Sequence, residues 1–216
     1  MPKCYMCNNE STSVDHAPPK GFFPIDMRNN LITVPACQLH NEDMSKDDEY
    51  ARNIITMSIE NNQTAIDLFF DKVYRSYQRH PGLVNPIKES LKDVSFYRTN
   101  AKSFVINRPR FDRVIRKIAY GLFYHEFKHT WDRLLAVTTN QIKMADMNND
   151  HLGEIFDSLT DDLNELVLKG NNPLVFQYAF IDSGPGLFEK GLFLVFFEGF
   201  PFWIIPEASS DHPDFD

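Results

Sequence analysis

Four residues near the start of the chain have the types and the spacing of a metal site. Cys4 and Cys7 form a CxxC pair, and Cys37 and His40 form a CxxH pair. A two-residue spacing lets both side chains of a tight turn reach one ion, and two such turns supply the four ligands of a closed tetrahedral zinc site. The chain has three cysteines and this pattern uses all of them, so we expect a structural Zn²⁺ here. Scattered free thiols are the alternative.

A second group of polar residues lies between the two cysteine pairs and just after them. It consists of Asp15-His16, which precedes Pro18-Pro19, and Asn41, which follows His40. Histidine titrates near neutrality and can accept a proton from water, whereas carboxylate and amide oxygens are ligands that Mg²⁺ and Mn²⁺ prefer. Phosphodiester hydrolysis needs such a base and such a cation. The structural alternatives are a turn-forming Asp15 and a helix-capping Asn41.

Over residues 1–50 the sequence resembles the HNH endonucleases, whose ββα-metal finger carries an Asp-His pair, a central Asn-Leu and a closing Asn or His after a cysteine knuckle. The corresponding residues are Asp15-His16, Asn30-Leu31 and Asn41. The resemblance implies that Asp15 and Asn41 bind a catalytic divalent metal, that His16 is the general base, and that Asn30 orients the site. It also implies a setting in bacterial defence or mobile-element biology.

His40 departs from the family pattern, because members with a knuckle usually have cysteine at this position. His40 therefore completes the zinc site or, displaced by one place, binds the catalytic metal. We favour the zinc site, because otherwise Cys4, Cys7 and Cys37 have no fourth ligand.

The composition indicates a folded protein without a membrane segment. A chain of 216 residues with 43% hydrophobic residues can bury a substantial core. It contains no apolar run of eighteen residues, and its first residues lack the basic start and apolar core of a signal peptide. We therefore expect a soluble, cytoplasmic protein that does not bind membranes.

The net charge of −8 is unusual for a protein whose expected partner is DNA, but the charge is unevenly distributed. Residues 98–143 carry 10 basic and 3 acidic side chains, whereas residues 144–216 carry 2 and 14. The sequence thus predicts phosphate contacts in and near the basic block. The predicted nucleic-acid contacts are Lys20, Lys46, Arg108, Arg110, Arg113, Arg116 and Lys117. A solvated charged face is the alternative.

The basic block also contains a motif that belongs to another class of enzyme. His125-Glu126-Phe127-Lys128-His129 matches HExxH, in which two histidines one helical turn apart bind zinc and the glutamate acts as base. Lys128 would oppose a bound cation, and the sequence offers no convincing third ligand. A zinc peptidase is therefore a minor alternative.

Hydrophobic periodicity predicts an α+β fold. We expect a zinc-stabilised ββα-metal finger in residues 1–50, a helical body in 51–172, an antiparallel β meander packed on the body in 173–206, and an acidic tail in 207–216. The expected helices are Ser45–Ile59, Thr64–His80, Pro86–Val94, Arg110–Thr130, Trp131–Met147 and His151–Lys169, with a further helix beginning near Cys37 and Asn41 in its first turns. A hairpin is expected from Ser95–Tyr97 to Ser103–Ile106, and the meander from Leu174–Ile181, Leu192–Phe197 and Phe200–Ile205.

The sequence therefore predicts a nuclease that hydrolyses DNA phosphodiesters with Mg²⁺ or Mn²⁺. The alternative is a non-catalytic zinc module that binds protein or nucleic acid, which the overall acidity and the aromatic C-terminal strands favour. The apolar face of those strands is expected to be buried, so the helices, a second copy of the chain or a protein partner would pack on it. Asp15-His16 and Asn41 oppose the non-catalytic alternative, because a finger without catalysis is not expected to need them.

Overall fold

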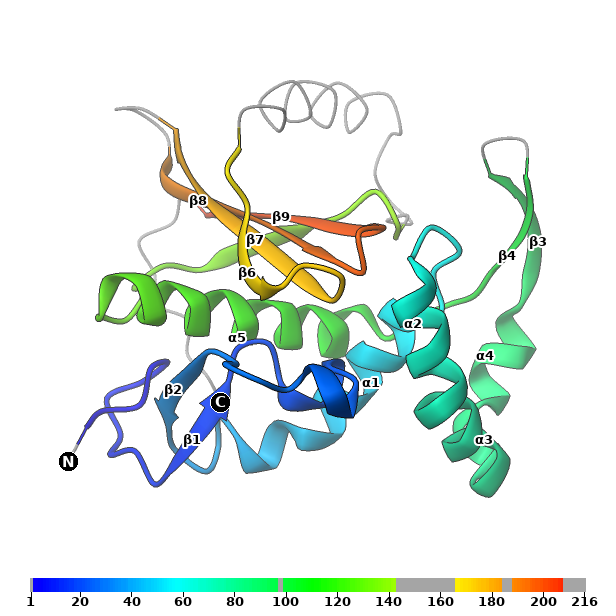
Figure 1. The fold of residues 1–216 in the computed structure, drawn as a ribbon, viewed down its shortest axis with the longest axis horizontal. Coiled ribbons are helices and arrows are strands. Elements are labelled where there is room, and N and C mark those ends of the chain that lie inside the picture. The colour runs from blue at the N-terminus through cyan, green and yellow to red at the C-terminus, as the bar shows by residue number, and fades with distance from the viewer. Residues whose placement is uncertain (1, 97–98, 143–165, 184–187, 208–216) are drawn as a thin grey trace. The chain divides into compact units, whose positions relative to one another are not determined.

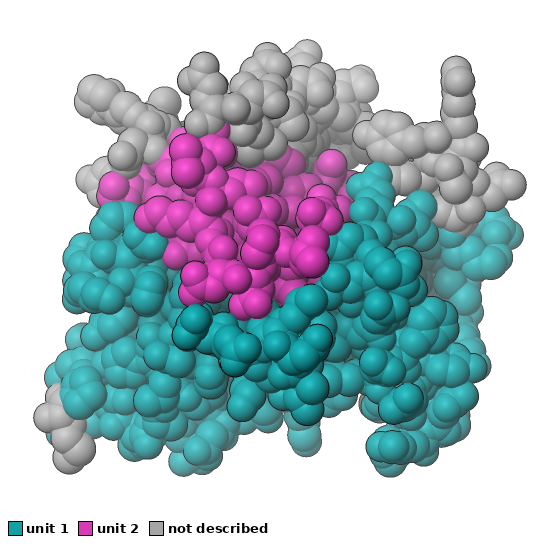
Figure 2. All heavy atoms as spheres, viewed as in Figure 1, with its two compact units in different colours: residues 1–131 teal, residues 132–216 magenta. Residues whose placement is uncertain are grey.

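The computed structural model describes the chain except residues 1, 97–98, 143–165, 184–187 and 208–216 (Figure 1). The chain divides into two compact units, Met1–Trp131 and Asp132–Asp216 (Figure 2). The first unit contains both the predicted finger and most of the predicted helical body. The fold is mixed helix and sheet, as expected. Among the described residues, no helix combines the length and apolar character needed to cross a membrane.

The first unit begins with a small hairpin that brings the two cysteine pairs together. Strands β1 (Ser13–His16) and β2 (Thr33–Ala36) pair antiparallel, with Asp15 opposite Val34 and His16 opposite Thr33. Because side chains alternate between the faces of a strand, Asp15 is buried while His16 remains half-exposed. The connecting loop carries the 3₁₀ turns η1 (Lys20–Phe22) and η2 (Ile25–Met27).

The chain after β2 forms a turn, not the helix predicted to begin near Cys37. The 3₁₀ turn η3 (Glu42–Met44) follows, and then α1 (Ser45–Thr56). Asn41 precedes η3 and its side chain does not cap it. That prediction was wrong because the Cys37–His40 segment bends back to bring its side chains together. The predicted helix start at Ser45 is confirmed.

A second helical segment follows α1 and runs without interruption over residues 63–79. It consists of α2 (Gln63–Leu68), the π-helical η4 (Phe69–Tyr74) and α3 (Arg75–Arg79). The Asn62 side chain accepts from the Ala65 main-chain N–H and so caps its first turn. The predicted stop at Pro81-Gly82 is confirmed by η5 (Pro81–Leu83). Helix α4 (Asn85–Ser90) and the hairpin of β3 (Lys92–Phe96) and β4 (Thr99–Ser103) come next.

Helix α5 (Arg108–Phe127) packs on both the finger and α1 (Figure 1). Asn107 caps its first turn, and Lys128 ends it in the left-handed conformation with φ 64°. Its apolar face, which includes Val114, Ile118 and Leu122, is buried. Gly121 permits a close approach to the finger, because a Cβ there would lie 2.7 Å from the Cβ of Ala17.

The second unit is a five-stranded antiparallel sheet in the order β5-β9-β8-β7-β6. Its strands are β5 (Leu135–Thr138), β6 (Lys169–Asn172), β7 (Phe176–Ser183), β8 (Phe188–Phe196) and β9 (Phe200–Pro206). The predicted three-stranded meander corresponds to β7, β8 and β9. Phe197 and Glu198 have positive φ in the turn between β8 and β9.

Two helices predicted from periodicity are not found where the structure describes the chain. The described part of Trp131–Met147 contains β5, whose residues Val137 and Thr138 pair with β9. Residues 143–147 lie outside the described residues. Most of the predicted helix His151–Lys169 also lies outside them, and Lys169 begins strand β6. Pairing with a distant strand therefore overrides the local helical pattern.

Candidate metal centre and the finger surface

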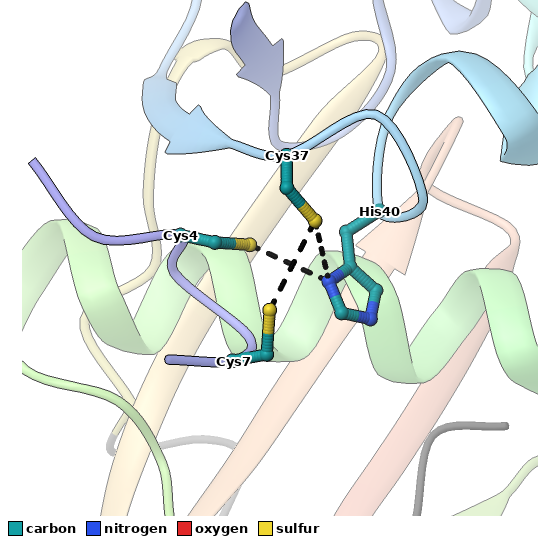
Figure 3. A group of neighbouring side chains, drawn as sticks. All are labelled: Cys4, Cys7, Cys37 and His40. Carbon is teal, nitrogen blue, oxygen red and sulfur yellow. Dashed lines mark hydrogen bonds between the residues drawn. The ribbon is translucent and has the colours of Figure 1, made fainter. Parts of the chain in front are cut away.

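The four predicted zinc ligands form one cluster. Cys4 and Cys7 come from the N-terminal segment, while Cys37 and His40 come from the turn after β2, and all four side chains point toward one another (Figure 3). Their ligand atoms all lie within 4.8 Å of one another. Cys4, Cys37 and His40 are buried and Cys7 is half-buried. The cluster could therefore hold a zinc ion.

The distances within the cluster match those expected around one tetrahedral ion. The Sγ atoms of Cys7 and Cys37 are 3.9 Å apart, and His40 Nδ1 lies 3.4 Å from Cys4 Sγ and 3.3 Å from Cys37 Sγ. Ordinary Zn–S and Zn–N bonds at tetrahedral angles would separate two sulfurs by about 3.8 Å and a sulfur from a nitrogen by about 3.6 Å. His40 thus belongs to the cysteine cluster, and Nδ1 is the atom that could bind an ion held there.

Main-chain N–H groups hold the Cys4–Cys7 turn of the cluster and tie it to β2. The Met6 N–H donates to Cys4 Sγ at 3.5 Å, and the Tyr5 N–H donates to the Pro35 carbonyl at 2.9 Å. Burial, with further contributions from the neighbouring thiols Cys4 and Cys37, raises the pKa of Cys7 to about 12. Thiolates crowded in this way repel one another, so a bound cation would favour the deprotonated ligands.

Asp15, a predicted catalytic metal ligand, lies inside a buried ion-pair network. The residue is 5% exposed. One carboxylate oxygen, Oδ1, accepts from the His16 main-chain N–H at 2.7 Å, and the other, Oδ2, accepts from Tyr5 Oη at 3.1 Å. The ammonium of Lys117, which is 1% exposed, lies 3.2 Å from Oδ2 and donates to Asp48 Oδ2 at 2.7 Å. Asp15 and Asp48 therefore share one buried cation.

This network does not suit a divalent metal at Asp15. Both carboxylate oxygens have partners, and a metal ion would have to displace or face the Lys117 ammonium. Burial raises the pKa of Asp48 to about 6, although Lys117 acts to lower it. The residues as placed therefore do not form the predicted Mg²⁺ or Mn²⁺ site.

The two predicted asparagines have local structural roles. The Asn41 side-chain amide donates to Ser13 Oγ at 2.9 Å and to the Val14 carbonyl at 3.3 Å, which ties the cysteine turn to β1. Asn30 is exposed and has a φ of 53°, a left-handed conformation that asparagine tolerates better than most residues. Its predicted role in orienting His16 stays a prediction.

His16 differs from these neighbours. Within the described residues its imidazole makes no hydrogen bond or ion pair with another protein group. Burial lowers its pKa, and the cations Lys20 and Arg28 lower it further against the opposing effect of Asp15. The lowered pKa favours the neutral form of this half-exposed ring, in which one nitrogen can accept a proton.

The predicted nucleic-acid contacts on α5 are mostly engaged within the protein. Arg110 and Arg113 both pair with Asp47, and Arg108 pairs with Asp112. The prediction was wrong for Lys117, which is buried with Asp15 and Asp48. The acidic first turn of α1 attracts the basic face of α5, so intramolecular pairing accounts for much of the basic block. Lys20 and Lys46 are exposed, and Arg116 is half-buried.

The HExxH motif does not have the geometry of a zinc peptidase. Helix α5 ends at Phe127, and the left-handed Lys128 directs the chain away before His129. His125 and His129 are therefore not one turn apart on a helix, as that motif requires. The His129 ring instead packs edge-on against Phe123, with centroids 5.1 Å apart. The peptidase alternative is set aside.

Sequence reasoning missed Tyr5, Asp48 and the structural role of Lys117. The sequence did indicate that Lys117 is buried. Lys117 lies between Val114 and Gly121 on the apolar helical face that also carries Ile118. A lysine on an apolar helix face is expected to have a buried anionic partner. The identity of that partner requires the fold.

Comparison with protein-family models, with curated proteins and with solved structures gives no match for this chain.

Proposed function

We propose that this protein is an HNH-type endonuclease that hydrolyses DNA phosphodiester bonds, with His16 as general base and a structural Zn²⁺ at Cys4, Cys7, Cys37 and His40. One observation carries the proposal. The His16 imidazole is half-exposed and, in the part of the chain that the structure describes, has no bonded protein partner. The side chains of Asp15 and Asn41, by contrast, are engaged in hydrogen bonds within the protein. A neutral imidazole in this position is suited to accept a proton.

The reaction would use His16 in one proton transfer. His16 would take a proton from water as the water oxygen attacks phosphorus, the bond between phosphorus and the leaving oxygen would break, and the leaving alkoxide would take a proton from solvent. Lys20 and Arg28, whose charges act on His16, would offset the negative charge of the phosphate.

The resemblance to HNH enzymes implies Mg²⁺ or Mn²⁺ as well, but we assign no step to such an ion. Asp15 would have to exchange the Lys117 ammonium for the metal before it could act as a ligand. The assay should therefore be run with and without each metal. Cleavage that requires a metal would show that an ion takes part in the reaction, and Asp15 could bind that ion only if the Asp15–Lys117 pair opens.

The test is cleavage of plasmid and single-stranded DNA by protein whose zinc content has been measured. His16→Ala should lower the cleavage rate by roughly 10²- to 10⁴-fold, the usual contribution of a general base, with zinc content and far-UV circular dichroism unchanged. His125→Ala, a half-buried histidine of α5, is the matched control. Equal rates for the two variants would refute the role of His16.

A non-catalytic zinc module is the second candidate, and the buried Asp15 favours it. The Asp15–Lys117 pair and the Asn41 bonds to β1 give these residues structural roles, so their presence does not by itself require catalysis. Zinc-loaded, folded protein that binds DNA but cuts neither substrate with any metal would support this candidate.

A further inference from the structure

A pocket of about 360 Å³ lies in the first unit between α1 and the helical run of η4 and α3. Its lining residues are Glu49, Arg52, Asp71, Lys72, Arg75, Ser76, Arg79 and His80. None of these residues was singled out by the motifs. The pocket therefore marks a part of the surface that the candidate catalytic residues do not explain.

The pocket carries more positive than negative charge. Four of the lining side chains are lysine or arginine and two are carboxylates. The carboxylates have cationic partners, because Glu49 lies 3.3 Å from Arg52 and Asp71 lies 3.6 Å from Arg75. The side chains of Lys72 and Arg79 form no hydrogen bond or ion pair with any residue that the structure describes. Two cations in the pocket thus lack an anionic partner among the described residues.

Lys72 is held where a positive charge is unfavourable. Burial, together with the nearby charges of Arg28 and Arg52, lowers its pKa to about 8. A bound anion would relieve this repulsion, whereas a second cation would increase it. An arginine guanidinium can donate hydrogen bonds to two oxygens of one phosphate. The Lys72 ammonium and the Ser76 hydroxyl can each donate to a further phosphate oxygen.

The pocket is linked to the loop that follows His16. The Nη1 atom of Arg52 would lie 3.5 Å from a Cβ at Gly21, so this guanidinium rests against the η1 turn. Arg28, in the same loop, acts electrostatically on His16 as well as on Lys72 and Arg52. An anion in the pocket would therefore lie on the side of the finger that carries this loop.

We infer that the pocket formed by Arg52, Lys72, Arg75 and Arg79 binds a phosphate oxyanion. Resting on the proposed nuclease function, this phosphate belongs to the DNA strand being cut and positions the strand relative to His16. A free phosphate compound offers the same chemistry, and the experiment separates these two sources.

The experiment measures binding without cleavage. All proteins carry His16→Ala, and the probe is a fluorescently labelled single-stranded DNA oligonucleotide followed by anisotropy. Lys72→Gln/Arg79→Gln removes the two cations that have no anionic partner, and Lys88→Gln/Lys92→Gln removes two exposed cations from α4 and β3 as the control. The pocket variant should bind the oligonucleotide at least about 10-fold more weakly than the control. The slope of its log binding constant against log salt concentration should fall in magnitude by about 2. Lys72→Arg should bind like the parent protein.

Competition identifies the source of the phosphate. If inorganic phosphate or a mononucleotide displaces the oligonucleotide at concentrations where sulfate does not, the pocket takes a free phosphate compound. If neither displaces it, the phosphate is that of a strand, as inferred. Equal binding of all probes by the pocket variant and the control overturns the inference, as does absence of binding by the parent. Because no cleavage is measured, a failed nuclease assay leaves this result intact.

Discussion

The N-terminal finger and the C-terminal sheet obtain their stability in opposite ways. In the finger each strand of the hairpin has four residues, and what surrounds them is a cluster of three cysteines and a histidine together with a buried lysine shared by two aspartates. In the sheet β8 has nine residues, among which Leu194 and Phe196 are buried, and β9 adds the buried Phe202.

This difference follows from the amount of apolar surface that each region can bury. A hairpin with such short strands contributes few apolar side chains of its own, so we expect the cluster that could hold a metal, together with the paired charges, to supply much of its stability. The sheet buries phenylalanine rings that pack on one another, such as Phe200 and Phe202 with centroids 5.1 Å apart. The finger should therefore respond to chelation and to changes in charge, and the sheet to changes in side-chain volume.

Loss of the proposed zinc should have the largest effect on stability. It should destabilise the finger and leave the sheet folded. Cys37→Ala removes one of four ligands, and a structural zinc contributes on the order of 10 kcal/mol or more to folding. We expect the variant to retain no zinc and to lose hydrogen-exchange protection in β1 and β2. The amides of β7, β8 and β9 should stay protected, because their ladder does not involve the metal.

Chelation of the parent protein provides the control for this prediction. A zinc chelator should reproduce the exchange pattern of Cys37→Ala, and added Zn²⁺ should reverse it. A zinc-free Cys37→Ala protein with protected β1 and β2 amides would refute the structural role of the cluster.

Replacement of Lys117 should have the next largest effect. Lys117→Met leaves Asp15 and Asp48 as two buried carboxylates without a cation, which typically costs about 3–5 kcal/mol. The free energy of unfolding at pH 7 should fall by this amount in urea denaturation. Asp48→Asn is the matched control and should cost less, because Lys117 then keeps Asp15 as its partner.

The loss in Lys117→Met should depend on pH. The ammonium lowers the pKa of Asp48, so its removal raises the folded-state pKa further above the unfolded value. A group with a raised folded pKa contributes stability below its unfolded pKa and loses it as pH rises through the folded pKa. The difference in the free energy of unfolding between Lys117→Met and the parent should therefore be smaller at pH 4 than at pH 7. A difference independent of pH would indicate lost packing and not unpaired charge.

A cavity in the sheet should reduce stability without this dependence on pH. Phe202 is fully buried and packs edge-on against Phe196, with centroids 6.1 Å apart. Phe202→Ala should cost about 3–5 kcal/mol, the usual range for a buried phenylalanine. The cost should be the same at pH 7 and pH 5 and should not change the zinc content. Zinc loss in this variant would contradict the separation drawn between the two regions.

Local spacing made the cysteine cluster predictable, whereas the partners of the charged residues were not. Two CxxC-like turns specify their ligands within a few residues, so the cluster could be inferred without a fold. The Asp15–Lys117 pair joins residues far apart in sequence. A basic helix can face either nucleic acid or the acidic end of another helix, and only the packing of α5 on α1 selects between these.

The same distinction between local and distant contacts explains the errors in secondary structure. Helix α5 has a continuous apolar face, so a helix could be predicted at Arg110–Thr130 without knowledge of its partners, although the observed helix is Arg108–Phe127. Strand β5 has four residues and is defined by its pairing with β9, some 70 positions later in the chain by the Leu135–Pro206 register. Short strands of this kind carry too little periodicity to be told from a helix.

Gly121→Ala should give the smallest effect and tests how closely α5 must approach the finger. Alanine in an exposed helix is usually more stable than glycine by about 1 kcal/mol. At Gly121 the new Cβ would lie 2.7 Å from the Cβ of Ala17, whose main-chain N–H is bonded to the Ile32 carbonyl, so α5 must shift. We expect a net loss of about 1–3 kcal/mol in urea denaturation.

Gly82→Ala is the matched control for Gly121→Ala, because a Cβ there meets no atom within 4 Å. It should leave stability unchanged or raise it slightly, since alanine restricts the unfolded chain. A shift of α5 would also move Lys117 away from Asp15, so the loss in Gly121→Ala should be smaller at pH 4 than at pH 7, as in Lys117→Met. If Gly121→Ala is as stable as Gly82→Ala, the finger tolerates displacement of α5, and its stability depends on the metal cluster more than on the buried ion pair.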